Sequence, residues 1–217
     1  MFLPYRDDNP RVLIPYVTYA LVGINVAVFL LQMAGPREFT LVFAIIPKMA
    51  TLDFEHFVLS LFTSMFLHGS ISHLGGNMLY LWIFSDNVEG ILGHGKFIIF
   101  YLVSGLVAGI VQTLVDPSST VPIVGASGAI AGVLAAYMII FPHARVHTFL
   151  FLFFYFTTIR IPAFYILGFW FLIQLTNGLS ILGVDTTGGV AWFAHIGGFV
   201  AGLGLVQLLR KVSIKSY

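Results

Sequence analysis

The chain of 217 residues is 59% hydrophobic and 9% charged, with a mean hydropathy of +0.97. Because a soluble domain has about 25% charged residues, this composition excludes an ordinary soluble protein and indicates an integral membrane protein in contact with the lipid bilayer. The net charge of +1 gives no sign of a nucleic-acid partner, and the absence of cysteine excludes disulfides, thiolate nucleophiles and cysteine-ligated metals.

Six apolar stretches have the roughly 20 residues that a helix needs to cross about 30 Å of hydrocarbon. They predict an all-α membrane protein, a bundle of six transmembrane helices within one domain, residues 16–210. Residues 1–15 lack the pattern of a signal peptide and are expected to form a cytosolic lead-in, and residues 211–217 a cytosolic basic tail. The predicted spans are approximately 16–35, 73–92, 96–115, 122–141, 163–182 and 192–209.

The basic residues predict the orientation of the bundle. If the N-terminus is cytosolic, Arg37 and Lys48 lie on the outer side and the other eight lie in the cytosol, as expected from the excess of Lys and Arg in cytosolic loops. The second, fourth and sixth spans then begin at the outer face, so their first polar side chains can meet. The eight cytosolic residues are Arg6, Arg11, Lys96, Arg145, Arg160, Arg210, Lys211 and Lys215.

Two further segments are apolar but irregular. Residues 37–72 interleave phenylalanine and leucine with polar residues, which is typical of a segment lying in the membrane interface. Residues 146–161 are too short to span comfortably, so we expect an interfacial or re-entrant stretch there.

A lone serine lies among small residues in VGASGAIAG, residues 124–132. Pro122 and Gly125 disfavour a helix before it, which predicts a helix that begins close to Ser127. A helix start presents free backbone N–H groups that suit a developing oxyanion, so Ser127 is a candidate nucleophile beside half of its own oxyanion hole. The alternative is a helix cap in a packing seam, because Gly128 and Gly132 form a small-xxx-small contact.

A candidate general base lies at the start of the sixth span. His195 shares a helix face with Gly198 and Gly202, and this smooth face matches that of the fourth span. If the two faces pack, His195 comes within hydrogen-bond distance of Ser127, as nucleophilic catalysis requires. The alternative role for His195 is a structural hydrogen bond between helices.

The second span places His73 and Asn77 one above the other on a helix face. Both side chains can donate hydrogen bonds without a fixed charge, which an oxyanion site can use. They could instead only tie helices together. We expect no metal, because no HExxH motif occurs and no carboxylate near His73 completes a zinc site.

No carboxylate is available to complete a triad. Asp86 and Glu89 lie about 20 Å from His73 along the same helix at 1.5 Å per residue, and Asp116 and Asp185 are expected in outer loops. The sequence therefore predicts a Ser-His dyad whose imidazole is held by packing, for instance against an aromatic ring.

These motifs resemble those of the rhomboid family of intramembrane serine proteases. The matching residues are the HxxxN of 73–77, the GxSG of 125–128 and the AHxxGxxxG of 194–202, in the family's order and on the second, fourth and sixth spans. Residues 63–69 and 86–89 are also similar, and the resemblance covers roughly residues 16–210.

The resemblance implies a nucleophile at Ser127, a general base at His195, and an oxyanion hole made by His73, Asn77 and the Ser127 backbone N–H. It also implies that residues 37–72 are a membrane-embedded first loop and that the fifth span with loop 183–190 is a lateral gate and cap. No cofactor is implied. Two departures concern the anchoring of the first loop and of the His195 ring: Leu59-Ser60 stands in place of a Trp-Arg pair, and Ala131 in place of a tyrosine.

The expected function is an intramembrane endopeptidase that cleaves membrane proteins with an unstable transmembrane helix near the outer face. Water would reach the serine through a cavity lined by Ser64, His68, Ser72 and the outer loops. The expected location is a bacterial or archaeal plasma membrane, with an organelle membrane as the alternative. Three alternatives remain: a catalytically silent rhomboid-like binder of membrane proteins, a transporter or channel, and a structural scaffold held by glycine packing.

Overall fold

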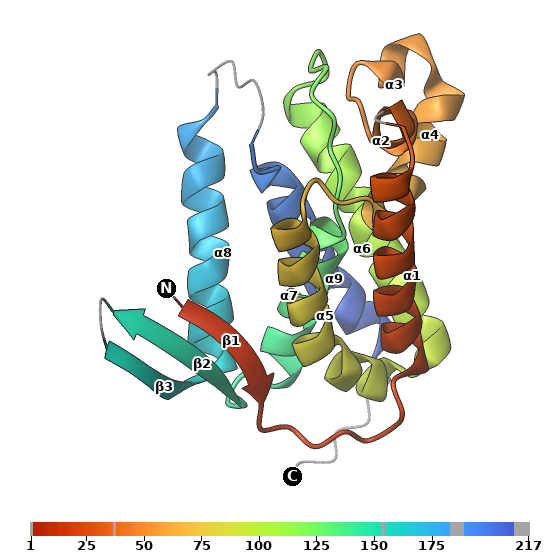
Figure 1. The fold of residues 1–217 in the computed structure, drawn as a ribbon. Helices are drawn as coiled ribbons and strands as arrows, with labels where there is room; N and C mark the ends of the chain where they lie inside the picture. Colours follow the sequence, from red (N-terminus) through yellow and green to blue (C-terminus); the bar gives the residue numbers. More distant parts are fainter. Residues whose placement is uncertain (1, 37, 153–154, 183–188, 211–217) are drawn as a thin grey trace.

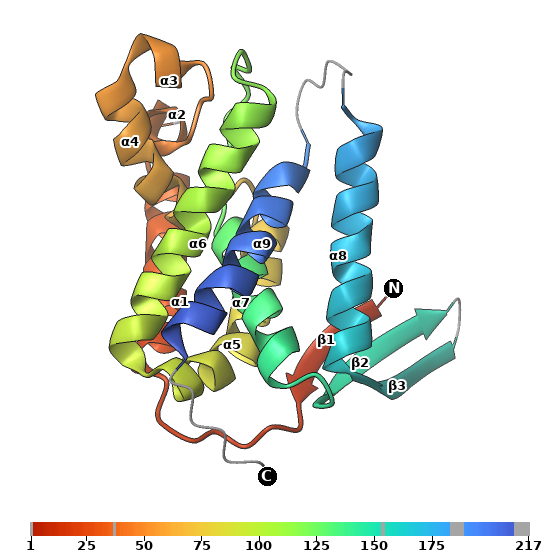
Figure 2. The same ribbon diagram turned by 180° about the vertical axis from the view of Figure 1, so that it is seen from behind.

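The computed structural model describes residues 2–36, 38–152, 155–182 and 189–210. Most of the chain is helical, and a small sheet lies at one end of the helical bundle (Figures 1 and 2). The elements in chain order are β1 (Phe2–Asp7), α1 (Tyr16–Ala34), α2 (Glu38–Phe43), α3 (Met49–Leu52), α4 (Phe54–Thr63), the 3-10 helix η1 (Ser64–Phe66), α5 (Ile71–Leu92), α6 (His94–Val115), α7 (Ser127–Ile140), β2 (Arg145–Leu152), β3 (Tyr155–Pro162), α8 (Ala163–Ser180) and α9 (Trp192–Leu209).

Helix α7 is the centre of the bundle. It contacts α5, α6, α8 and α9, and its residues 128–137 are all buried. Both views show it enclosed by these neighbours, with α1 and α8 toward opposite edges (Figures 1 and 2). A helix buried on every side reads as uniformly apolar in the sequence, as this one does.

The count of six spans is not settled by helix length and composition. Helices α1, α6, α8 and α9 are long and apolar enough to cross a membrane, and α5 qualifies only together with α4 and η1, from which it is bent by 79°. The fourth predicted span, 122–141, forms a helix of only 14 residues, α7. Residues 122–126 stay outside the helix because Gly125 adopts a positive φ of 127°.

A three-stranded antiparallel sheet corrects the all-α prediction. Its strand order is β1-β2-β3, so the lead-in pairs with a segment about 145 residues away. The stretch 146–161 is the hairpin of β2 and β3, in which Val146 pairs with Ile161 and Phe151 with Phe156. An interfacial or re-entrant stretch was expected there, but its strand conformation was not, because both faces are apolar and period-two alternation is weak.

The first loop, residues 37–72, contains short helices that pack against the bundle. Helix α4 packs against α6 and is contacted by α2 and α3, and its Phe57 and Leu61 meet Ile45 in a small core. Ile45 also forms a two-way backbone bridge with Ile123, in the segment that leads to α7. Ser60, at one position of the expected anchoring pair, is buried and donates a hydrogen bond to a backbone carbonyl of its own helix.

At the opposite end of the bundle, polar contacts join the helix ends to one another. The buried Glu89 of α5 accepts hydrogen bonds from the backbone N–H groups of Val17 and Thr18, which caps α1. Lys96 of α6 donates to the last carbonyl of α9 at 2.7 Å, and Arg11 pairs with Asp86 at 2.7 Å. The described basic residues predicted to be cytosolic thus share one end, while Lys211, Lys215 and the predicted tail 211–217 lie outside the described residues.

Candidate active site

Helix α7 begins at Ser127, as the Pro122 and Gly125 pattern predicts. The backbone N–H of Ser127 therefore has no acceptor within the helix. The preceding loop is held by Gly125, whose N–H donates to the Ser64 carbonyl at 2.9 Å. A Cβ at Gly125 would lie 2.8 Å from the His73 ring, so this loop passes directly over the second span.

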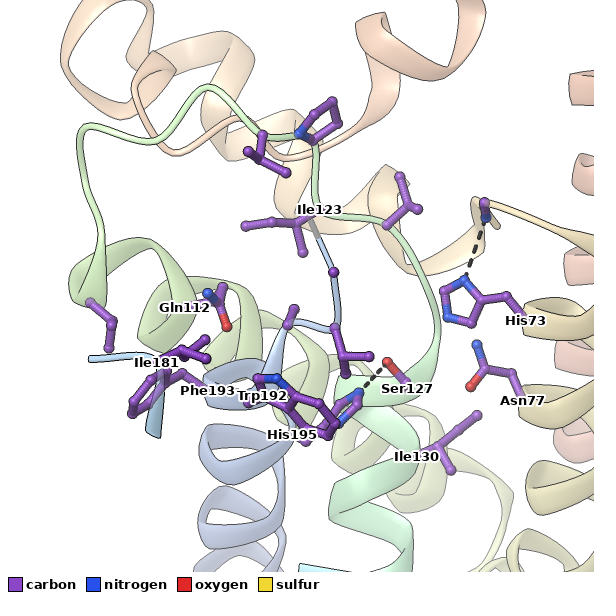
Figure 3. Close-up of a pocket in the computed structure, with 18 of the residues that line it drawn as sticks. His73, Asn77, Gln112, Ile123, Ser127, Ile130, Ile181, Trp192, Phe193 and His195 are labelled. Atoms are coloured by element: carbon purple, nitrogen blue, oxygen red, sulfur yellow. Dashed lines mark hydrogen bonds between the residues drawn. The ribbon is translucent and has the colours of Figure 1, made fainter. Parts of the chain in front are cut away.

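The structure brings Ser127 and His195 together. Oγ of Ser127 lies 2.8 Å from Nε2 of His195, and the histidine is 9% exposed (Figure 3). His73 and Asn77 approach the same serine from the other side, on α5 (Figure 3). The four side chains come from α5, α7 and α9, so the site depends on how these helices pack.

Glycine residues allow α7 and α9 to approach closely enough for His195 to reach Ser127. A methyl group at Gly198 would overlap the main chain of Gly128, and one at Gly202 would overlap that of Gly132. These are the two smooth faces expected from the sequence, and they meet in the predicted register. Small residues at such a crossing let two backbones approach without intervening side chains.

A glutamine holds the imidazole, which corrects the expectation that packing alone does so. Oε1 of Gln174, on α8, lies 2.7 Å from Nδ1 of His195. Nε2 of Gln174 donates to the Trp170 carbonyl at 3.1 Å. Because a carbonyl can only accept, the amide orientation is fixed, and Nδ1 of His195 must carry the proton. Its Nε2 lone pair then faces Ser127, as a general base requires.

Aromatic rings complete the surroundings of the imidazole. The ring centroids of Trp170 and Trp192 lie 5.7 Å and 6.4 Å from that of His195. The aromatic packing suggested by the sequence is therefore present, but it comes from α8 and α9. Ala131 is fully buried in the core.

His73 and Asn77 present donors toward Ser127. The Gly69 N–H donates to Nδ1 of His73 at 3.4 Å, which leaves the proton on Nε2. Nδ2 of Asn77 is buried and has no hydrogen-bond partner among the described residues. An unpaired buried donor is costly in the resting protein, so this atom is a candidate to bind an anionic group.

A cavity of about 940 Å³ opens at the serine. It is lined by Tyr80 of α5 on one side and Trp170 of α8 on the other, and reaches past Ser127 and His195. Ser72 lines it as expected. Ser64 and His68 are buried elsewhere and do not line it, which corrects the prediction that they form its wall.

Among the described residues, no group of three or more His, Asp and Glu side chains is placed to hold a metal ion. Asp116 lines the outer part of the cavity. Residues 183–188, which include Asp185 and most of the expected cap, lie outside the described residues.

A family model described as the rhomboid domain matches residues 55–212. The chain belongs to the rhomboid family. This confirms the resemblance drawn from the three motifs, and a multi-pass membrane protein is consistent with its apolar helices.

Curated rhomboid relatives come from mitochondria and from bacteria. Rhomboid protein 1, mitochondrial, of Saccharomyces cerevisiae is 36% identical over 68% of this chain and 42% of its own length. Rhomboid protease GluP of Bacillus subtilis is 30% identical over 87% of this chain and 34% of its own length. Rhomboid protease GlpG of Klebsiella pneumoniae is 32% identical over 44% of this chain and 34% of its own length. The matches thus span less than half the length of these relatives.

Two glutamines of this rhomboid were missed by sequence reasoning. Gln174 orients His195, and Oε1 of Gln112 on α6 accepts the Ala194 N–H at 3.0 Å, which caps the helix that carries the histidine. Each is an amide side chain within an apolar span, and that was the available signal. A polar side chain in such a span is a functional candidate by default.

Proposed function

We propose that this rhomboid is an intramembrane serine endopeptidase that cleaves transmembrane segments of membrane proteins with a Ser127-His195 dyad. The observation that carries the proposal is the hydrogen-bonded chain from Gln174 through His195 to Ser127, with distances of 2.7 and 2.8 Å. In this arrangement the basic Nε2 of His195 faces the hydroxyl of Ser127. This is the arrangement of nucleophile, base and orienting group that activates a serine.

The reaction follows from these contacts. Oγ of Ser127 attacks the scissile carbonyl carbon while Nε2 of His195 takes the hydroxyl proton. The tetrahedral intermediate collapses, the C–N bond breaks, and His195 gives the proton to the leaving amine. A water molecule, deprotonated by His195, then attacks the ester carbonyl, and the released Ser127 regains its proton. Gln174 acts as a positioning residue that accepts from Nδ1 of the imidazolium.

The oxyanion hole is assigned to His73, Asn77 and the Ser127 backbone N–H. Three observations support the assignment: the free N–H at the start of α7, the proton on Nε2 of His73, and the unpaired Nδ2 of Asn77. Each donor gains an anionic partner only when negative charge develops on the substrate oxygen. Such donors stabilise the transition state more than the ground state.

The substrate is proposed to be a membrane-spanning helix that unwinds near its outer end and enters beside α8. The cavity lies between Tyr80 of α5 and Trp170 of α8, which provides a lateral path from the lipid to Ser127. A helix must unwind to expose a carbonyl, because its backbone groups are otherwise paired internally. Substrates with an unstable transmembrane helix are therefore favoured.

Six spans with a cytosolic N-terminus remain the proposed topology. Support comes from the basic residues gathered at one end and from α7, which is short but enclosed by other helices. The location in a bacterial or archaeal plasma membrane is likewise a proposal. The bacterial GluP, which matches 87% of the chain, favours it, whereas the yeast relative is named for mitochondria.

A catalytically silent rhomboid that binds membrane proteins is the second candidate. The test is cleavage of a model transmembrane substrate by the purified protein in proteoliposomes, with Ser127→Ala as the matched variant. Cleavage by the wild type alone supports the protease. Retained binding of the substrate without cleavage by either protein supports the silent binder.

A further inference from the structure

The hairpin of β2 and β3 carries an aromatic, uncharged end. Residues 148–159 contain six aromatic side chains and no Asp, Glu, Lys or Arg. Charged groups are confined to the other end of the strands, where Arg145 and Arg160 are exposed and His147 pairs with Asp8 at 2.6 Å. The hairpin is therefore polarised along its length.

Three of the aromatic rings, those of Phe149, Phe151 and Phe156, lie on one exposed face of the hairpin. Phe151 pairs with Phe156 across the strands, with ring centroids 4.7 Å apart, and Phe149 lies 5.9 Å from Phe156. Phe156 is 62% exposed. β2 and β3 also contact α8, and Phe149 and Phe151 nevertheless remain 38% exposed. A cluster of exposed aromatic rings of this kind marks a contact surface.

The position of the hairpin beside α8 indicates that lipid covers this face. Both views show its far end level with the lower turns of α8, beside the bundle rather than beyond its end (Figures 1 and 2). At that level α8 exposes Phe164, Tyr165 and Phe169. The aromatic face of the hairpin thus continues the lipid-facing surface of a membrane-spanning helix.

We propose that the hairpin of β2 and β3 inserts its aromatic end into the lipid leaflet on the basic side of the protein, while Arg145 and Arg160 lie among the phosphate headgroups. Apolar faces that contain Phe bind at the boundary between headgroups and acyl chains, and arginine favours anionic headgroups. Edge strands rarely face acyl chains, because unpaired backbone groups are costly there. A shallow position at this boundary, where water still reaches the edge of β3, avoids that cost.

The insertion would fix the base of α8, since β3 runs directly into α8 at Ala163. Between Ala163 and Ser180 the buried residues of α8 are Ala163, Leu167, Gln174 and Gly178, which form one narrow stripe against the bundle. The hairpin therefore supplies a second attachment, to the membrane, at the helix that carries Gln174. This inference does not depend on the proposed protease activity.

The absence of cysteine allows a direct test with single spin labels. Phe156→Cys places the label on the outer face of the hairpin, Phe169→Cys on the lipid-facing side of α8, and His143→Cys in the exposed turn before β2. The labelled proteins are reconstituted in phosphatidylcholine and phosphatidylglycerol vesicles. Power saturation then measures collision with oxygen, which concentrates in lipid, and with a water-soluble nickel chelate.

The proposal predicts that the label at 156 resembles that at 169, with oxygen access exceeding nickel access, and that the label at 143 shows the reverse. A label at 156 that behaves like that at 143 would overturn it. Low access to both reagents with spin-spin broadening would also overturn it, because a second copy of the chain would then cover the face. Should Phe156→Cys fail to fold, Phe149→Cys tests the same face.

Discussion

Replacing Gln174 with leucine should slow catalysis without preventing folding. The side chain is 4% exposed and accepts from Nδ1 of His195 at 2.7 Å. Leucine has a similar volume but no acceptor, so Nδ1–H would lose its partner and the imidazole would lose the bond that fixes its tautomer. The imidazolium formed during attack on the substrate would lose the same bond.

The size of the effect follows from the cost of an unpaired buried donor. That cost is about 1–3 kcal/mol, and about 1.4 kcal/mol corresponds to a factor of ten in rate. We therefore expect kcat for a transmembrane substrate in proteoliposomes to fall about 5- to 150-fold. KM should change little, because Gln174 does not line the cavity.

Two further variants separate orientation from folding. Gln174→Glu keeps an oxygen at the same place and should recover most of the lost rate. Thr176→Val replaces an exposed polar side chain on the same helix, whose hydroxyl donates to the carbonyls of Leu172 and Ile173, and should leave kcat unchanged. A Gln174→Leu protein with the kcat of the wild type would refute the orienting role.

Three other variants test the packing, the oxyanion hole and the sheet. Gly198→Ala should lower the detergent melting temperature, because overpacking costs about 1–3 kcal/mol, whereas Gly204→Ala, with open space around it, should not; equal melting would contradict the close helix crossing. Asn77→Leu should lower kcat about 10²- to 10³-fold without lowering the melting temperature, and a large loss of stability with unchanged kcat would instead indicate a structural tie. Burial raises the pKa of the Asp7 carboxyl, so its stabilising contribution is present below its unfolded value of 3.8 and is lost as the pH rises through the folded value. Asp7→Asn should therefore gain melting temperature relative to the wild type as the pH rises above 3.8, and a difference that is constant with pH would contradict this.

The sequence predicted the elements whose signals are local. The start of α7 at Ser127 follows from Pro122 and Gly125 just before it. The contact of α7 with α9 follows from glycines spaced four apart on both helices, because only that pairing uses both smooth faces.

The elements that were missed depend on tertiary packing. The sheet required a partner for β2, and that partner, β1, lies at the other end of the chain. Gln174 could orient His195 only if α8 turned that face inward, and an apolar span carries little periodic signal to fix its rotation. His68 is polar and near the site in sequence, yet it packs between the rings of Phe29 and His73 instead of lining the cavity.

The short α7 shows why counting apolar residues misjudged one span. Residues 122–126 are apolar enough to extend the helix, but Gly125 turns the backbone over His73 and the helix starts late. A span enclosed by other helices need not match the thickness of the bilayer, because it does not face lipid.

The central claim is that Ser127 is an activated nucleophile, and labelling with a fluorophosphonate probe tests it most directly. The purified protein in detergent is compared with Ser127→Ala and His195→Ala, and an unrelated serine hydrolase serves as a positive control. We expect the wild type to be labelled and both variants to remain unlabelled although folded. A well-folded wild type that stays unlabelled while the control reacts would contradict the claim and favour a rhomboid that binds membrane proteins without cleaving them.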